Sequence, residues 1–374
     1  MKPTKQTASD KKPLIILTAG GTGGHVFPAE SLAEELIKRG YELALITDSR
    51  GKDNYHGKLS EISNYSVCSG ALVGKSKLFK IKSLFKTCWG IVQAAYILFT
   101  KKPVCVIGFG GYASFPCSMA AILLGIDLVI HEQNSVMSRT NRFLSKYATL
   151  IAQSFRNVKY TPAHIKTILT GMPIRSSISV LNGNIYSKPG EGGYRLLIIG
   201  GSQGAKIFGD VIPEAIKLLP QELQKKLTVT QQCREDDIPL VEPRYKDTAC
   251  TLNISHFFHN MPELYTKSHL IISRAGASSV FEIAAAGLPS VLIPLPTAAD
   301  DHQTANTKYI TDFKGGLVIT QKEFTPEKLA QTLTDLFENP EKLVQMSSNI
   351  RRAAITNAAE RFADAVEKEI IAKR

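Results

Sequence analysis

The sequence predicts an α/β protein with two Rossmann-like domains, whose parallel sheets face each other across a cleft. The first observation is length, because 374 residues exceed what a single hydrophobic core usually supports. The second is that short apolar strands alternate with helix-length segments through most of the chain, as in βαβ units. The third is that one combination of strand, glycine turn and helix occurs twice, near Leu14 and near Arg195.

The first combination opens the N-terminal half. Leu14–Thr18 is a short apolar run, and a glycine-rich turn follows it. Pro28–Arg39 then carries apolar residues at helical spacing and is followed by Gly40, a residue type common at helix ends. Leu43–Thr47 begins the next strand. This order predicts the start of a parallel sheet.

The second combination opens the C-terminal half. Arg195–Ile199 leads into GGSQGA, then into a helix reaching about Leu219 and a strand at Leu227–Gln231. Residues 170–193 between the halves are rich in Gly, Ser, Pro and Asn, which is typical of a linker. We therefore expect a hinge at Gly171–Ser176.

These signals predict the domain limits. Residues 1–11 are polar and basic, and we expect a disordered tail there. Residues 12–174 should form an N-terminal Rossmann-like domain, and residues 175–349 a C-terminal Rossmann-like domain. The stretch from Pro340 to Arg374 is predicted to be helical, with about 350–374 crossing back to the first domain.

Composition limits the chemistry. The six cysteines show no C-x-x-C pair, which argues against a disulfide framework or a cysteine metal site. No D-x-D triplet or histidine–carboxylate cluster with metal spacing occurs, so we expect no bound metal and no cofactor. No apolar stretch reaches the roughly 20 residues of a membrane-spanning helix, which predicts a soluble or peripheral protein. The net charge of +12 fits nucleic acid, an anionic membrane or an anionic substrate.

One basic segment favours a membrane surface. Residues 75–89 mix lysines with large apolar side chains, as interfacial helices do. An ordinary amphipathic helix with its apolar side in the core explains the composition equally well. No basic, aromatic-lined surface for nucleic acid is apparent elsewhere. The residues predicted at the membrane are Lys75, Leu78, Phe79, Lys80, Lys82, Phe85, Lys86 and Trp89.

Two glycine loops of the N-terminal half are candidate anion sites. TAGGTGGHVFPA (18–29) lies between a strand and a helix, where glycines let backbone N–H groups approach a phosphate. His25 at its end is a candidate general base, although a lone histidine is more often structural. IGFGGYASFP (107–116) repeats the pattern and suits a diphosphate acceptor, or makes only a tight turn.

Polar residues follow other predicted strands. His131, Glu132, Gln133 and Asn134 come after the strand Leu128–Ile130, at the sheet edge where ligands bind. In the second half, RAGASSVFE (274–282) can begin a helix whose N–H groups meet a diphosphate. Glu282 suits both hydroxyls of a ribose, and the Gln303 amide suits those of a sugar.

In order and spacing, GGTGGHVFPA, GFGGYASFP, HEQN, GMPIR, GGSQGA, RAGASSVFE and DDHQTAN resemble the MurG family of bacterial peptidoglycan glycosyltransferases. The resemblance implies a GT-B fold and inverting transfer of N-acetylglucosamine from UDP-GlcNAc. The implied acceptor is the C4 hydroxyl of undecaprenyl-diphospho-MurNAc-pentapeptide (lipid I), and the product is lipid II. It also implies peripheral binding to the anionic cytoplasmic face of the inner membrane, with cell-wall synthesis proteins as possible partners and no nucleic acid.

Carried over by position, the resemblance implies roles for individual residues. His25 would be catalytic, and Phe258 would lie beside the uracil. Donor contacts are implied for Thr22, Gly23, Gly24, Asn134, Arg175, Ser202, Phe258, Ala277, Ser278, Ser279, Val280, Phe281, Glu282 and Gln303. The acceptor diphosphate would meet Gly108, Gly110, Gly111 and Tyr112. This chain departs from the family pattern at Met172 (usually Asn), Ser138 (usually Gly) and Phe258 (usually aliphatic).

Two other functions remain open at this point. A UDP-GlcNAc 2-epimerase shares the architecture and the donor, but has no need of a lipid-interface segment. A non-catalytic nucleotide-sugar-binding protein could keep the same loops.

Overall fold

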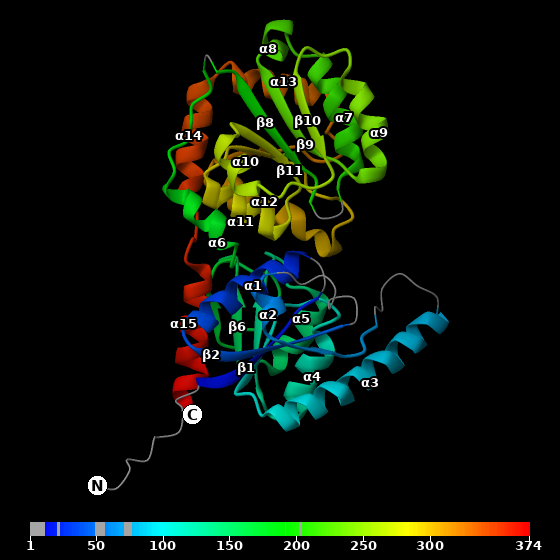
Figure 1. Ribbon diagram of the computed structural model, residues 1–374, viewed down its shortest axis with the longest axis vertical. Coiled ribbons are helices and arrows are strands. Elements are labelled where there is room, and N and C mark those ends of the chain that lie inside the picture. Colours follow the sequence, from blue (N-terminus) through cyan, green and yellow to red (C-terminus); the bar gives the residue numbers. More distant parts are fainter. Residues whose placement is uncertain (1–11, 21–22, 49–56, 71–76, 191, 202–203) are drawn as a thin grey trace, which may run out of the picture.

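The computed structural model describes residues 12–20, 23–48, 57–70, 77–190, 192–201 and 204–374. The predicted tail at residues 1–11 lies outside them, as do Thr22, Lys75 and Ser202. The described chain forms two α/β domains stacked along the long axis of the molecule (Figure 1).

The N-terminal domain is built on a sheet in which all strand pairs are parallel. Within the described residues its strands are β1 (Lys12–Thr18), β2 (Tyr41–Thr47), β3 (Ser63–Ser66), β4 (Cys105–Gly108), β5 (Asp127–Glu132), β6 (Leu150–Gln153) and β7 (Thr167–Leu169). Its helices are α1 (Gly23–Lys38), α2 (Lys58–Glu61), α3 (Lys77–Lys101), α4 (Phe115–Leu123) and α5 (Arg139–Leu144). The strand order is β3-β2-β1-β4-β5-β6-β7.

The C-terminal domain repeats this plan. Its described strands are β8 (Tyr194–Ile199), β9 (Leu227–Gln232), β10 (Thr251–Ser255), β11 (Leu270–Ser273), β12 (Ser290–Leu292) and β13 (Gly316–Val318), in the order β10-β9-β8-β11-β12-β13. The short helix α6 (Ser176–Ser179) precedes it. The remaining helices are α7 (Lys206–Lys217), α8 (Gln221–Lys225), α9 (Ile238–Val241), α10 (Met261–Lys267), α11 (Ala277–Ala286), α12 (His302–Thr311), α13 (Pro326–Phe337), α14 (Pro340–Arg351) and α15 (Ala358–Glu369).

The predicted fold class, two Rossmann-like domains with parallel sheets, is confirmed. Two boundaries differ in ways that matter for the site. Helix α1 starts at Gly23, so His25 lies in its first turn rather than in the loop before it. Strand β5 runs to Glu132, two residues beyond the predicted end. His131 and Glu132 are therefore strand residues, and both are buried inside the domain.

Each face of the N-terminal sheet is covered by helices. Alternate residues of β1 point to opposite faces: Ile15 and Leu17 pack with α1 and α15, whereas Ile16 packs with α3 and α4. Both faces are thus apolar, which explains why the strands read as continuous hydrophobic runs.

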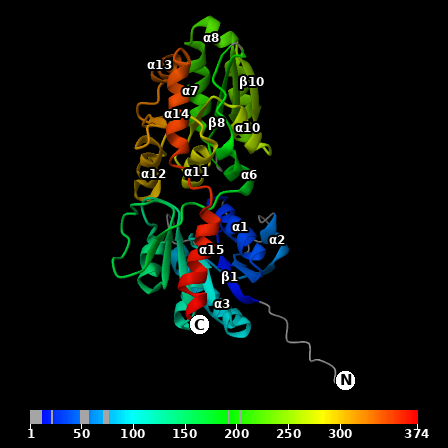
Figure 2. The same ribbon diagram turned by 90° about the vertical axis from the view of Figure 1, so that its left-hand side faces the viewer.

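The C-terminal helices connect the two domains. Helix α14 packs in the C-terminal domain, and the chain then runs down to α15 beside α1 (Figure 2). Arg39 at the end of α1 pairs with Asp364 at 2.7 Å and Glu367 at 2.8 Å. Phe362 is fully buried and meets the rings of Phe109 and His131, with centroids 6.1 and 5.4 Å apart.

Truncating Phe362 should destabilise the N-terminal domain. Phe362→Ala removes a buried ring and leaves a cavity beside the sheet, so we expect the free energy of unfolding to fall by about 3–5 kcal/mol. Urea unfolding followed by near-UV circular dichroism measures the change. Phe313→Ala, at a side chain 42% exposed, is the control and should cost well under half as much. A loss of unfolding free energy for Phe362→Ala as small as that for Phe313→Ala would show that α15 contributes little packing.

Candidate active site between the two domains

Four glycine-containing loops lie at the two points where strand order reverses. In the N-terminal sheet, β1 and β4 are neighbours, and the loops after Thr18 and Gly108 leave their carboxyl ends. In the C-terminal sheet, β8 and β11 are neighbours, followed by the loops after Ile199 and Ser273. Parallel α/β sheets bind ligands in the crevice at such switch points.

His25 lies against the second glycine loop. Gly110 and Gly111 have φ values of 85° and 77°, a region that residues with a Cβ rarely adopt. A Cβ at Gly111 would lie 3.1 Å from the His25 Nε2 atom, so glycine is needed there for space as well. Burial lowers the pKa of His25 to about 4, which leaves the imidazole neutral at pH 7. A neutral imidazole can accept a proton.

A buried carboxylate shapes the loop after β5. Glu132 accepts hydrogen bonds from the backbone N–H groups of Asn134 (2.9 Å) and Ser138 (3.1 Å) and from Asn141 Nδ2 (2.8 Å). Burial raises the Glu132 pKa, and these donors oppose the shift. Glu132 therefore holds the loop that presents Asn134 and does not itself face the cleft.

His131, the other residue corrected in β5, is structural. Its ring lies 5.5 Å from that of Phe109, and its Nε2 is 3.1 Å from Ser154 Oγ. Burial lowers its pKa to about 3, so it stays neutral in the core.

The start of α11 is another candidate anion site. Gly276 is the N-cap residue of the helix. Among the described residues, no N-cap side chain accepts a hydrogen bond from the backbone N–H groups of the first turn. The Ser278 hydroxyl is buried and has no partner there. Free N–H groups and an unpaired hydroxyl at the start of a helix suit a diphosphate. One turn later, Glu282 is buried and accepts a hydrogen bond from Tyr265 Oη at 3.0 Å.

Arg175 links the two halves of the site. Its Nη2 lies 3.1 Å from Glu282 Oε1, and its guanidinium stacks on the ring of Phe27, 4.9 Å from the centroid. Phe27 belongs to α1, two residues after His25. Burial raises the Glu282 pKa, and Arg175 opposes the shift. The Arg175 Nε is buried without a partner in the described chain, which leaves a donor for a ligand oxygen.

The remaining predicted residues lie at the same edges. Gly24 is in the first turn of α1, and half-buried Phe258 follows β10. Gln303 lies in α12, and its Oε1 accepts from the Leu295 backbone N–H at 3.0 Å. Tyr112 is 42% exposed beside the second glycine loop. No group of three or more His, Cys, Asp or Glu in the described part of the chain could hold a metal ion.

Two of the departures from the family pattern have local explanations. Ser138 precedes α5 and its side chain accepts a hydrogen bond from the Asn141 backbone N–H at 3.2 Å, which caps the helix. Met172 is buried, with its Sδ 3.4 Å from Ser154 Oγ. Neither residue strains the loop that carries it.

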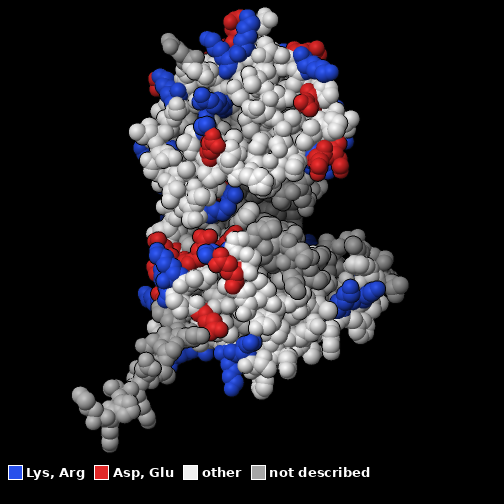
Figure 3. Space-filling model, in the orientation of Figure 1, with Lys and Arg blue, Asp and Glu red and all other residues white. Residues whose placement is uncertain are grey.

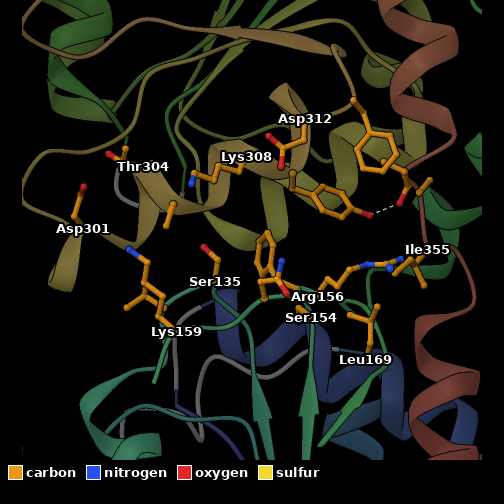
Figure 4. A pocket seen from close by; sticks show the side chains of 18 of the residues that line it. Ser135, Ser154, Arg156, Lys159, Leu169, Asp301, Thr304, Lys308, Asp312 and Ile355 are labelled. Carbon is orange, nitrogen blue, oxygen red and sulfur yellow. Dashed lines mark hydrogen bonds between the residues drawn. The ribbon is translucent and has the colours of Figure 1, made fainter. Parts of the chain in front are cut away.

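A cavity of about 780 Å³ also lies between the domains. Lys159 from the N-terminal domain and Lys308 from α12 project into it, and Ile355 of the α14–α15 connection lines one side (Figure 4). None of the predicted donor or acceptor residues that the structure describes lines this cavity. This cavity is therefore distinct from the glycine loops.

Three residues of this region carry no clear functional signal in the sequence. Phe27 and Tyr265 resemble ordinary core aromatics in the sequence, and Asn306 stood in the DDHQTAN segment without an assigned role. Their significance depends on contacts across the chain, which local spacing does not reveal.

Comparisons with known proteins identify the family. Residues 15–153 match the glycosyltransferase family 28 N-terminal domain, and residues 195–367 match its C-terminal domain. The UDP-N-acetylglucosamine--N-acetylmuramyl-(pentapeptide) pyrophosphoryl-undecaprenol N-acetylglucosamine transferase of Paramagnetospirillum magneticum is 44% identical over 96% of this chain and 97% of that protein. The protein of the same name from Rhodospirillum rubrum is 42% identical over 94% and 91%.

Solved structures agree. The crystal structure of MurG from Acinetobacter baumannii has a TM-score of 0.77 and 32% identity, covering 96% of this chain and 99% of that one. A UDP-GlcNAc 2-epimerase from Neisseria meningitidis, with a TM-score of 0.67, 17% identity and coverage of 95% and 100%, shares the fold alone. The high identity over nearly the full length, with both domains matched, shows that the chain belongs to the MurG family of glycosyltransferases.

Proposed function

We propose that this protein transfers N-acetylglucosamine from UDP-GlcNAc to the C4 hydroxyl of lipid I, with inversion, to form lipid II. The observation that carries the proposal is the link through Arg175. This residue contacts Glu282 in the proposed donor site and Phe27 in α1, the helix whose first turn holds His25. Donor and acceptor groups are thus held within one connected set of side chains.

The proposed mechanism is a direct displacement. Neutral His25, directly or through a water, takes the proton of the acceptor hydroxyl as that oxygen attacks the anomeric carbon. The bond to UDP breaks, and its negative charge is stabilised by the N-terminus of α11 and by Arg175. Glu282 accepts hydrogen bonds from the ribose, and Gly108, Gly110, Gly111 and Tyr112 hold the acceptor diphosphate.

A transfer assay tests the proposal. Purified protein is incubated with labelled UDP-GlcNAc, with and without lipid-linked diphospho-MurNAc-pentapeptide and without added metal, while UDP release and label in lipid are measured. Acceptor-dependent transfer is expected. Donor binding without transfer would favour a non-catalytic binder, and 2-epimerised product would favour the epimerase.

We also propose that α3 binds an anionic membrane. Ile81, Leu84, Phe85, Trp89 and Tyr96 are each more than half exposed. The residues that α3 turns inward include Ser83, Thr87 and Ala94. A stripe of large apolar side chains on α3 thus points to solvent, although Leu98 near the end of the helix packs in the core.

The surroundings of α3 suit the same role. Leu123 at the end of neighbouring α4 is 68% exposed, and Lys80, Lys82 and Lys86 are exposed along α3. Figure 3 shows a mostly uncharged surface over α3 and α4, with basic side chains near both ends of α3. No helix of the described residues is both long enough and apolar enough to cross a bilayer. Insertion of apolar side chains beneath headgroups that contact the lysines accounts for this surface.

Charge reversal on α3 should weaken vesicle binding. Replacing Lys80, Lys82 and Lys86 together by Glu should reduce binding to phosphatidylglycerol vesicles at least about 100-fold, since each basic residue contributes about 1 kcal/mol. Co-sedimentation at low and high salt measures the effect. The control replaces exposed Lys246, Lys322 and Lys342 of the C-terminal domain. Equal binding to neutral and anionic vesicles would contradict the proposal.

A further inference from the structure

One buried side chain joins the two domains at the candidate site. Asn306 of α12 is fully buried and makes four hydrogen bonds. Its Oδ1 accepts from the Ser135 backbone N–H at 3.0 Å and from Ser135 Oγ at 2.8 Å. Its Nδ2 donates to Ala275 O and to Asn134 Oδ1, both at 3.1 Å. Ser135 and Asn134 belong to the N-terminal domain, and Ala275 and Asn306 to the C-terminal domain.

The chemistry of these partners fixes the orientation of the Asn306 amide. The Ser135 backbone N–H can only donate, and the Ala275 carbonyl can only accept. Asn306 therefore must direct its oxygen to Ser135 and its nitrogen to Ala275. Both lone-pair positions and both N–H groups are used, so no other residue of this shape satisfies the same four partners.

The orientation of Asn306 sets that of Asn134. The second N–H of Asn306 requires an acceptor, so Asn134 must turn its Oδ1 toward it. The Asn134 backbone N–H is already held by Glu132. The Asn134 Nδ2 then remains as the free end of the side chain, without a hydrogen-bond partner among the described residues. Asn134 is half-buried, so this donor can reach a ligand.

We propose that Asn306 is a positioning residue that makes Asn134 present an N–H donor, rather than a carbonyl oxygen, to the sugar of the donor. This inference rests on the proposed function. The same amide holds Ala275, which directly precedes the Gly276 N-cap of α11. Asn306 therefore sets Asn134 relative to the start of the helix that receives the diphosphate.

A double-mutant cycle tests the proposal in the full-length protein. Asn306→Ala, Asn134→Ala and the double variant are assayed for kcat and KM with UDP-GlcNAc and lipid I, with UDP affinity and Tm measured alongside. We expect each single variant to lower kcat about 100-fold, as misplacement of a substrate-positioning group does. Because Asn306 acts through Asn134, the double variant should lose less than about threefold more than Asn134→Ala alone. UDP affinity should be nearly unchanged, since the nucleotide is proposed to bind the C-terminal domain.

A second substitution guards against misfolding. Asn306→Asp keeps the shape and the contacts to Ser135, but faces two carbonyl oxygens without N–H donors, so Asn134 must flip to donate to it. It should lower kcat like Asn306→Ala, and the same cycle with Asn134→Ala applies if Asn306→Ala does not fold. Asn339→Asp, at the exposed start of α14, is the matched charge control and should leave kcat unchanged.

The outcomes separate the two levels of inference. Losses that multiply in the double variant, with wild-type transfer intact, overturn the role of Asn306 alone. A fall in UDP affinity equal to the fall in kcat does the same, because it would show general disruption of the domain interface. Wild-type protein that transfers no sugar overturns the proposed function and this role with it.

Discussion

Replacing His25 by alanine should lower kcat about 100-fold to 10,000-fold, the usual contribution of a positioned general base. UDP affinity should change little, because the nucleotide is assigned to the C-terminal domain. We expect the fall in kcat because the His25 ring borders Gly110 and Gly111, where the acceptor diphosphate is proposed to bind. Steady-state transfer kinetics and calorimetry with UDP measure the two quantities.

The pH dependence of the wild-type enzyme adds an independent check on His25. A base must be neutral to act, and burial lowers the His25 pKa to about 4. The rate should therefore stay flat as pH falls from 8 through the ordinary histidine range near 6.5. It should fall only below about pH 5, as the imidazole becomes protonated. A decline in kcat/KM centred near pH 6.5 would contradict the buried, neutral state of this ring.

His164→Ala is the matched control. His164 is exposed on the connection between β6 and β7, and its loss should leave kcat, KM and the pH profile as in wild type. Full activity of His25→Ala would assign the proton transfer to another group.

The architecture could be predicted from the sequence because its signals are local. The runs Leu14–Thr18 and Arg195–Ile199, each followed by glycines and an apolar helical stripe, required no knowledge of distant contacts. The predicted end of β5 was wrong because the surroundings of its last residues come from other parts of the chain. His131 and Glu132 look like cleft residues by polarity, but Phe362, from the far end of the chain, and Asn141 provide their surroundings.

The orientation of α3 shows the same limit. The composition of this helix supported two interpretations equally well. Lysines mixed with apolar residues suit a membrane-binding helix, and they also suit an amphipathic helix that packs on a core. Only the packed fold shows that Phe85 and Trp89 point outward. Which side of a helix is covered depends on its neighbours, and here those neighbours cover Ser83 and Thr87 as well as Leu98 near the end of α3.

The candidate site was predicted in its parts and not in its connections. His25 and Glu282 were each chosen from their own loops. Their link runs through Arg175, which is separated from Glu282 by 107 positions in the chain, and through the stacking of Arg175 on Phe27. The interdomain contacts of Asn306 span a still longer separation. Spacing within a motif cannot predict such pairs.

The second large effect is expected at Glu282. Glu282→Gln keeps the size of the side chain but removes the charge that is proposed to accept hydrogen bonds from the ribose hydroxyls and that pairs with Arg175 at 3.1 Å. A hydrogen bond to a charged group contributes about 1.5–3 kcal/mol, so UDP affinity should fall about 10- to 100-fold. Because the bond between sugar and phosphate is broken elsewhere, kcat at saturating donor should change much less.

Ligand analogues show whether that loss comes from the ribose. Wild-type protein should bind UDP more tightly than 2′,3′-dideoxy-UDP, and Glu282→Gln should bind both equally weakly. Tyr265→Phe, which removes only the hydroxyl that donates to Glu282 at 3.0 Å, should cost about 1 kcal/mol and keep the preference for UDP. If Glu282→Gln still distinguishes the two nucleotides as wild type does, the carboxylate does not read the ribose. Its pairing with Arg175 would then serve only to hold α11 against the segment between the two domains that carries Arg175.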